Sequence, residues 1–221
     1  MGISIVLLSG GIDSTVALAE EVARDDSEIH ALTVSYGQRH VREVGAARFI
    51  AEHYGVPWRH VEIDLSWATA HLAAPEQCRT LEEIRKEKIS PAYVPARNTL
   101  LISLALVYSD AIGAEKIILS ANAGDGHAFP DCRPEFFAAM NTAAKIGTTS
   151  RPRIVAPYLH KAKSEVVWRG HLIGVPFAQT VSCYSDRTDS NPCGKCDACL
   201  LRLDAFQSTG LVDPLFYLVD W

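Results

Sequence analysis

The chain has 221 residues, 48% of them hydrophobic, which is enough to bury a full core in one domain or in one domain with an appendage. No apolar run reaches the roughly 18 residues of a membrane span, and the N-terminus lacks the basic region of a signal peptide. We therefore expect a cytoplasmic protein with no membrane partner. The net charge of −5 and the pI of about 5.9 argue against a nucleic-acid partner, because nucleic-acid-binding domains are usually basic.

The first element is a continuous apolar run over residues 5–8, typical of a parallel strand buried on both faces. Ser9, Gly10 and Gly11 end this strand, and Asp13 is the expected N-cap of a helix over residues 14–24. A glycine turn between a strand and a helix N-terminus favours anions, because unpaired amides and the helix dipole converge there. The turn therefore predicts a phosphate site.

Two common phosphate motifs are excluded at this turn. The Walker loop requires a lysine that is missing here, and the dinucleotide fingerprint requires a glycine spacing that Gly10-Gly11 does not have. Residues 9–15, Ser-Gly-Gly-Ile-Asp-Ser-Thr, instead resemble the S-G-G-x-D-S signature of the PP-loop ATP pyrophosphatases. That resemblance implies a loop that grips the β- and γ-phosphates of ATP while the α-phosphorus is attacked. The alternative is a glycine turn without a ligand.

Further strands and helices alternate along the first half of the chain. Strands are expected at 29–35 and 58–65, with a helix at 41–54 between them. This alternation predicts an α/β fold with a doubly wound parallel sheet, in which ligands bind at the carboxyl ends of the strands. Gln38, Arg39 and His40 follow the second strand directly, so we expect them beside the nucleotide as substrate-binding residues.

The middle of the chain carries more polar candidates. Residues 66–90 read as a solvated helix or loop, with a substrate-dependent lid as the alternative. Arg97 precedes a long apolar helix over 99–112, which Asn98 or Thr99 would cap, and it could clamp a phosphate. A strand at 116–120 leads into a polar loop over 122–133, followed by a helix over 135–146.

That loop and the next helix start supply the remaining candidates. Asp125, Asp131 and Arg133 could read a purine-like base edge, although loop aspartates commonly only form turns. His127 could be a base, a stacking ring or a surface residue. A fifth strand covers residues 154–157. Lys161 and Lys163 then open a helix reaching residue 172, where a lysine opposes the dipole and is better explained by a nearby anion.

Four of the six cysteines crowd together with the spacing C-x9-C-x2-C-x2-C: Cys183, Cys193, Cys196 and Cys199. Four thiolates fill a tetrahedral zinc site and leave no position for water, so we expect structural zinc. An iron–sulfur cluster is the rival interpretation. The apolar face of residues 200–206 would dock this zinc-binding helical segment, residues 179–221, on the nucleotide-binding domain, residues 1–178. Cys78 and Cys132 remain, and Cys132 is expected to be a packed thiol rather than a nucleophile.

The motifs in their order along the chain resemble those of the QueC family, from residue 3 to about residue 206. They are residues 9–15, Tyr36-Gly37-Gln38-Arg39-His40, Val94-Pro95-Ala96-Arg97-Asn98, Pro130-Asp131-Cys132-Arg133, Ser182-Cys183-Tyr184 and the Cys-Gly-Lys-Cys-Asp-Ala-Cys run. The family converts 7-carboxy-7-deazaguanine and ammonia into 7-cyano-7-deazaguanine with ATP, in queuosine biosynthesis. The resemblance also suggests a homodimer.

The resemblance implies roles for individual residues. The four clustered cysteines would hold Zn²⁺, and Mg²⁺ would bridge the phosphates near Asp13. From their own chemistry and not from the resemblance, we expect Arg97, Lys161 and Lys163 to be catalytic as phosphate or carboxylate partners, together with Asp131 and Arg133. ATP would contact the stretch formed by Leu8, Ser9, Gly10, Gly11, Ile12, Asp13, Ser14, Thr15, Val16, Ala17 and Leu18.

One segment departs from the family pattern. The family commonly has Ser-Gly-Tyr where this chain has His127-Ala128-Phe129, so Phe129 lacks a hydroxyl but keeps a ring for stacking. If the segment touches substrate, the enzyme could stop at the amide or act on a related acid. Two further functions compete with this one. A tRNA-thiolating PP-loop enzyme is disfavoured by the acidic pI, and a zinc-knuckle scaffold would carry only a vestigial nucleotide site.

Overall fold

A five-stranded, all-parallel sheet with the strand order β3-β2-β1-β4-β5 forms the centre of the protein. The computed structural model describes residues 2–37, 41–69, 79–184 and 191–218. The strands are β1 (Gly2–Leu7), β2 (Ser27–Ser35), β3 (Trp58–Glu62), β4 (Lys116–Ile118) and β5 (Arg153–Val155). The predicted doubly wound parallel sheet is therefore confirmed. Because β1 pairs with β2 on one side and β4 on the other, the chain reverses its winding direction beside β1.

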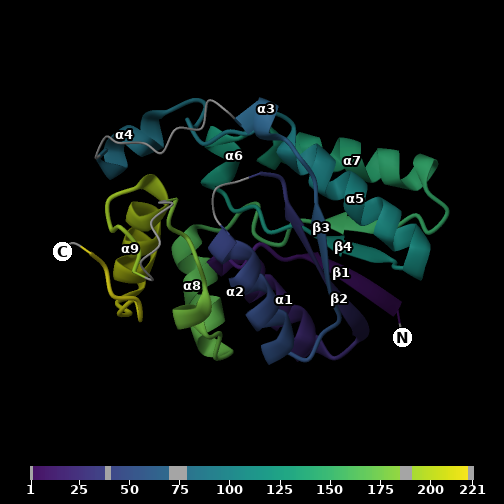
Figure 1. Cartoon of the computed structure of the whole chain (residues 1–221), viewed down its shortest axis with the longest axis horizontal. Coiled ribbons are helices and arrows are strands. Elements are labelled where there is room, and N and C mark those ends of the chain that lie inside the picture. Colours follow the sequence, from purple (N-terminus) through teal and green to yellow (C-terminus); the bar gives the residue numbers. More distant parts are fainter. Residues whose placement is uncertain (1, 38–40, 70–78, 185–190, 219–221) are drawn as a thin grey trace.

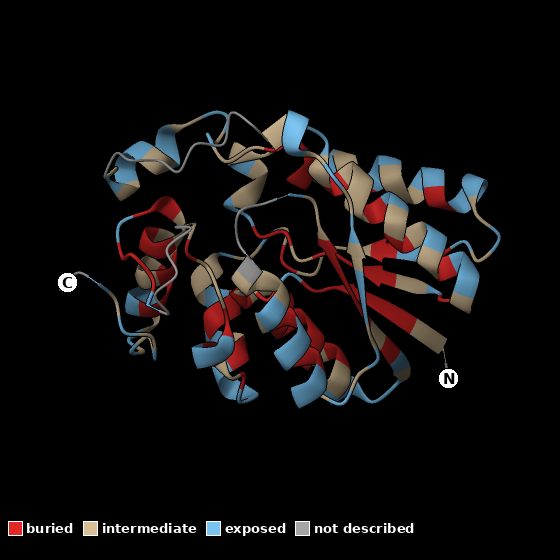
Figure 2. Ribbon diagram, in the orientation of Figure 1, coloured by how far each residue is buried: buried red, intermediate tan, exposed pale blue. Residues whose placement is uncertain are grey.

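Helices cover both faces of the sheet, as Figure 1 shows. The main ones are α1 (Ile12–Arg24), α2 (Val41–His53), α5 (Arg97–Ile112), α7 (Pro134–Gly147), α8 (Lys163–Leu172) and α9 (Asp197–Thr209). Alternate residues of β1 point to opposite faces. Val6 packs with α1, α2, α8 and α9, whereas Ile5 packs with α5 and α7. The buried positions in Figure 2 accordingly follow β1 and the inward sides of the helices around it.

Short helical turns occupy two stretches that the sequence indicated were irregular. They are α3 (Ser66–Thr69) and α4 (Leu81–Lys86) in the first, and α6 (Asp125–Ala128) and the 3₁₀ turn η1 (Pro130–Cys132) in the second. Thr80 and Glu83 form a capping box that starts α4, so this turn is specified locally. Because α6 and η1 lie within residues 122–133, that segment is partly helical and not the plain loop that the sequence indicated.

Two expected helix starts were wrong. Helix α1 begins at Ile12 with Gly11 as its N-cap, so Asp13 lies inside the first turn and not at the cap. Helix α5 begins at Arg97 after Ala96, which has a left-handed φ of 53°, so neither Asn98 nor Thr99 is its cap. Tertiary contacts account for the second case, because the Asp131 carboxylate accepts the Asn98 backbone N–H at 2.9 Å and replaces a local cap.

The C-terminal segment packs on α8 through α9. A further 3₁₀ turn, η2 (Phe177–Gln179), places Phe177 edge-on against Phe206, with ring centroids 5.2 Å apart. Arg202 is 1% exposed and its guanidinium pairs with Asp213, with Nε 2.7 Å from Oδ2. It also donates to the carbonyl oxygens of Phe177 and Thr180. The cysteine-bearing segment is thereby fixed to the sheet domain. Within the described ranges, no helix combines the length and apolarity needed to cross a membrane.

Candidate active site at the carboxyl edge of the sheet

The turn between β1 and α1 has a backbone that only glycine fits. Gly10 has a φ of +82°, and a Cβ there would lie 2.6 Å from the Glu43 carbonyl oxygen and 2.9 Å from the Ala47 nitrogen. The first turns of α2 therefore lie directly against the loop. Hydroxyl groups support the turn from inside, since Ser9 and Ser14 hydroxyls are 3.1 Å apart and Thr15 donates to the Gly11 carbonyl at 2.8 Å.

The start of α1 leaves backbone donors free for a ligand. Among the described residues, no acceptor pairs with the backbone N–H groups of Ile12, Asp13 or Ser14, and Thr15 is the first to bond back, to the Gly11 carbonyl. Three such amides at a helix N-terminus attract an anion. The side chains of Leu8, Val16, Ala17 and Leu18 lie in the core, so these members of the predicted stretch position the turn.

A pair of opposite charges stands beside these amides. Lys163 Nζ lies 2.6 Å from Asp13 Oδ2, and the Asn122 amide donates to the same oxygen at 3.3 Å. Although burial lowers the pKa of Lys163, the carboxylates of Asp13 and Asp125 raise it above its ordinary value. Lys163 therefore stays charged, next to the position where a phosphate would bind.

The second carboxylate oxygen of Asp13 supports the expected Mg²⁺. This Oδ1 atom is buried and has no hydrogen-bond partner in the described part of the chain. Burial first, and then the charge of Asp13, raises the pKa of Asp125 to about 6. Two carboxylates that repel each other, one with an unmatched oxygen, fit a divalent cation that binds through one or two carboxylates and phosphate oxygens.

Arg97 lies at the centre of the polar residues on this edge. Its guanidinium hydrogen-bonds Tyr36, and it interacts electrostatically with Cys132, Tyr184, Glu43 and Asp125. Burial lowers the pKa of Arg97, but these neighbours raise it overall, so the side chain stays a cation. It is suited to hold a carboxylate or a phosphate.

Two residues near Arg97 were not among the predicted site residues. Burial raises the pKa of Glu43 to about 7 despite the opposing charge of Arg97. Burial also raises the pKa of Tyr184, which interacts with Arg97, Glu43 and Asp125. Glu43 had no usable signal, because an acidic residue in a first helical turn is ordinary. Tyr184 had one, because it directly follows Cys183, a predicted metal ligand.

Asp131 and Cys132 hold α5 in place. Asn98 donates its backbone N–H to the Asp131 carboxylate at 2.9 Å and its side-chain amide to Cys132 Sγ at 3.1 Å. Burial raises the pKa of Cys132 to about 12, with the charges of Asp125 and Asp131 adding to it. The thiol is 4% exposed, so the prediction of a packed thiol is confirmed. Asp131 positions Arg97, the first residue of α5.

The remaining predicted residues are less tightly held. Arg133 is exposed and donates to the Gly126 carbonyl at 3.2 Å, and His127 is also exposed. The Phe129 ring lies 6.5 Å from that of Tyr93, at the edge of the same site. Lys161 contacts Ala123 only through its carbonyl oxygen, which accepts the Ala123 N–H at 3.0 Å. Gln38, Arg39 and His40 lie outside the described residues.

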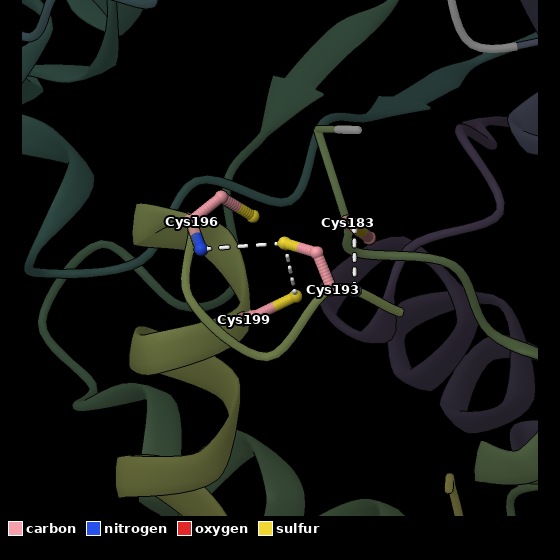
Figure 3. Close-up of side chains that lie close together, drawn as sticks. All are labelled: Cys183, Cys193, Cys196 and Cys199. Atoms are coloured by element: carbon pink, nitrogen blue, oxygen red, sulfur yellow. Dashed lines mark hydrogen bonds between the residues drawn. The ribbon is translucent and has the colours of Figure 1, made fainter. Parts of the chain in front are cut away.

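The four clustered cysteines converge as predicted (Figure 3). Their sulfur atoms all lie within 4.8 Å of one another, and a tetrahedral Zn²⁺ with Zn–S bonds of about 2.3 Å needs them about 3.8 Å apart. Backbone N–H groups of Cys193, Cys196 and Tyr184 donate to three of the sulfurs, as expected for thiolates. The cluster could therefore hold one metal ion. It also holds the backbone of Tyr184, whose N–H donates to Cys196 Sγ at 3.4 Å.

Comparison with known proteins agrees with this geometry. The model of the family "Queuosine biosynthesis protein QueC" matches residues 3–210. The chain belongs to the QueC family. A relative named 7-cyano-7-deazaguanine synthase, from Thermoplasma acidophilum, is 41% identical over 97% of this chain and 91% of its own length. A QueC-family relative of the same name, from Anaeromyxobacter dehalogenans, is 43% identical over 97% of this chain and 95% of its own.

These relatives are named as enzymes, so the prediction of an enzyme is confirmed. A solved NMN synthetase from Francisella tularensis covers 96% of this chain and 78% of its own, with a TM-score of 0.49 at 18% identity. That likeness is too low to bear on function. The turn after β1 lies at the carboxyl end of that strand, beside the winding reversal of the sheet.

Proposed function

We propose that this protein is an ATP-dependent ligase that converts 7-carboxy-7-deazaguanine and ammonia into 7-cyano-7-deazaguanine. The observation that carries the proposal is the turn after β1. Its free amides belong to a helix start whose Asp13 pairs with Lys163, and both Lys163 and Arg97 act electrostatically on Asp125. The chain is about 40% identical to proteins named 7-cyano-7-deazaguanine synthase. A cytoplasmic location and a homodimer belong to the same proposal.

The chemistry begins with a poor electrophile. A carboxylate resists attack by ammonia because its leaving group would be oxide. Attack of a carboxylate oxygen on the α-phosphorus of ATP forms an acyl adenylate and releases pyrophosphate. Ammonia then displaces AMP and leaves an amide. A second activation, on the amide oxygen, followed by loss of AMP, gives the nitrile.

The residues divide these tasks by position. The amides of residues 12–14 and the Lys163 ammonium bind the phosphates, and Arg97 orients the carboxylate of the acid. Asp13 and Asp125 would hold Mg²⁺, which when bound neutralises phosphate charge. Most of the rate then comes from positioning and from charges fixed before the reaction. Zn²⁺ on the four cysteines would hold the segment that carries Tyr184 in place.

The test is direct. Purified protein is incubated with ATP, Mg²⁺, ammonium and 7-carboxy-7-deazaguanine, and the products are identified by mass spectrometry. The nitrile is the expected product. An amide alone would mean that the His127-Ala128-Phe129 segment has changed the outcome, and an absence of ATP turnover would overturn the proposal in favour of a binding protein. Asp13→Asn is expected to abolish turnover while leaving the fold intact.

A further inference from the structure

Glu43 lies where the proposed nucleotide and acid would meet. A Cβ added to Gly10 would lie 2.6 Å from the Glu43 backbone carbonyl oxygen, so the first turn of α2 packs against the proposed phosphate-binding turn. The Glu43 side chain interacts with Arg97 from α5 and with Tyr184 from the segment after η2. Glu43 therefore lies between the phosphate-binding turn, which its backbone contacts, and Arg97, with which its side chain interacts.

The other carboxylates at this edge have partners. Asp13 pairs with Lys163, Asp125 accepts the Asn122 backbone N–H at 2.9 Å, and Asp131 accepts the Asn98 N–H. Glu43 has no ion pair and no hydrogen bond with any residue that the structure describes. Asp13 Oδ1 also lacks a partner but belongs to the proposed Mg²⁺ site, so Glu43 is the described carboxylate of this edge that is left for a different ligand. The ligand that suits a carboxylate is a cation.

The proposed reaction supplies such a cation. In water near neutral pH ammonia is mostly ammonium, which has no lone pair and cannot attack a carbonyl carbon. The charges of Arg97 and Lys163 also repel ammonium from the acid. We infer that Glu43 binds ammonium and takes one proton from it, so that ammonia is formed beside the acyl adenylate. This inference rests on the proposed function.

Protons and electron pairs balance in this step. One N–H bond of ammonium breaks and its proton passes to the Glu43 carboxylate. The freed lone pair forms the C–N bond at the acyl carbon. The C–O bond to the phosphate then breaks, its electron pair leaves with AMP, and the nitrogen releases one further proton to solvent. The products are the primary amide, AMP and protonated Glu43, which loses its proton before the next turnover.

The setting of Glu43 suits this task. A base works best when its pKa lies near the working pH. Burial raises the pKa of Glu43 to about 7, whereas a solvated glutamate would be too weak a base. Tyr184 interacts electrostatically with Glu43 from the neighbouring segment. Arg97 limits how far the pKa of Glu43 rises.

The experiment separates the two halves of the reaction in Glu43→Gln. The first half is measured as exchange of labelled pyrophosphate into ATP, dependent on 7-carboxy-7-deazaguanine and without ammonium. The second is measured as amide and nitrile formation over a range of ammonium concentrations. Hydroxylamine is a second nucleophile. It is mostly neutral near pH 7, needs no base to free its lone pair and gives a hydroxamate. Glu52→Gln is the control, because Glu52 lies on the same helix and is 61% exposed.

We expect Glu43→Gln to retain pyrophosphate exchange and hydroxamate formation within about threefold of the wild type. Its kcat/KM for ammonium should fall roughly 100-fold, the usual scale for loss of a general base. An unchanged ammonium dependence would overturn the inference, and so would loss of pyrophosphate exchange, since Glu43 would then serve the nucleotide. If Glu43→Gln does not fold, the same measurements are made on Glu43→Asp, in which the rate with ammonium should fall more than the rate with hydroxylamine. Absence of exchange in the wild type would instead refute the proposed function.

Discussion

The sharpest structural prediction concerns Gly10→Ala. The new methyl group would lie 2.6 Å from the Glu43 carbonyl oxygen and 2.9 Å from the Ala47 nitrogen, both backbone atoms that cannot move without shifting α2. Its left-handed φ of +82° adds about 1–2 kcal/mol for a residue with a Cβ. Overpacking adds about 1–3 kcal/mol. We therefore expect a loss of about 2–5 kcal/mol in the free energy of unfolding.

The assay is thermal unfolding, with adenylation measured well below the transition. For a domain of this size each 1 kcal/mol lowers Tm by about 2–4 °C, so a drop of roughly 5–20 °C is expected. Adenylation should be lost even where the variant is folded, because the amides no longer line up. Gly45→Ala is the matched control. It lies in α2 with no atom within 4 Å of its Cβ position, so it should stabilise by about 1 kcal/mol. Unchanged stability and activity in Gly10→Ala would refute the packing of α2 on this turn.

Three further predictions concern charge and metal. Arg202→Met leaves the Asp213 carboxylate buried without its cation. Urea unfolding should therefore show that the free energy of unfolding falls by about 3–5 kcal/mol, and a fall of less than about 1 kcal/mol would contradict the pairing. Folded Asp125 keeps its proton to about pH 6, whereas the unfolded group releases it near 3.8. Without Mg²⁺ the wild type should therefore lose stability relative to Asp125→Asn as pH rises between these values, and parallel pH profiles would disagree with the assigned burial. Cys199→Ser should purify with far less than one zinc per chain, whereas wild-type zinc content in this variant would remove Cys199 from the metal site.

The sheet could be predicted because each strand is an apolar run with local boundaries. The side chains of β1 are buried on both faces of the sheet, so its continuous apolar run predicts a buried strand even when the helices that cover it are not known. The glycine turn after β1 and the convergence of the four cysteines could also be predicted, because the residues of each lie close together in the sequence.

Contacts between residues far apart in the chain could not be predicted from the sequence. Ala96 is the N-cap of α5 because Asp131, far along the chain, accepts the Asn98 N–H. No local rule favours a left-handed alanine over Asn98 as a cap. Glu43 looks like any acid in a first helical turn. Only the packing of α2 against Gly10 brings it to the site. Asp131 resembles a turn former but holds the helix that carries Arg97.

The step on which the proposed mechanism depends most is the joining of the acid to AMP. Turnover of 7-carboxy-7-deazaguanine labelled with ¹⁸O in its carboxylate, followed by mass spectrometry of the released nucleotides and phosphates, tests this most directly. We predict AMP carrying a single labelled oxygen and unlabelled pyrophosphate. Label in inorganic phosphate with formation of ADP, or label in water alone, would contradict it.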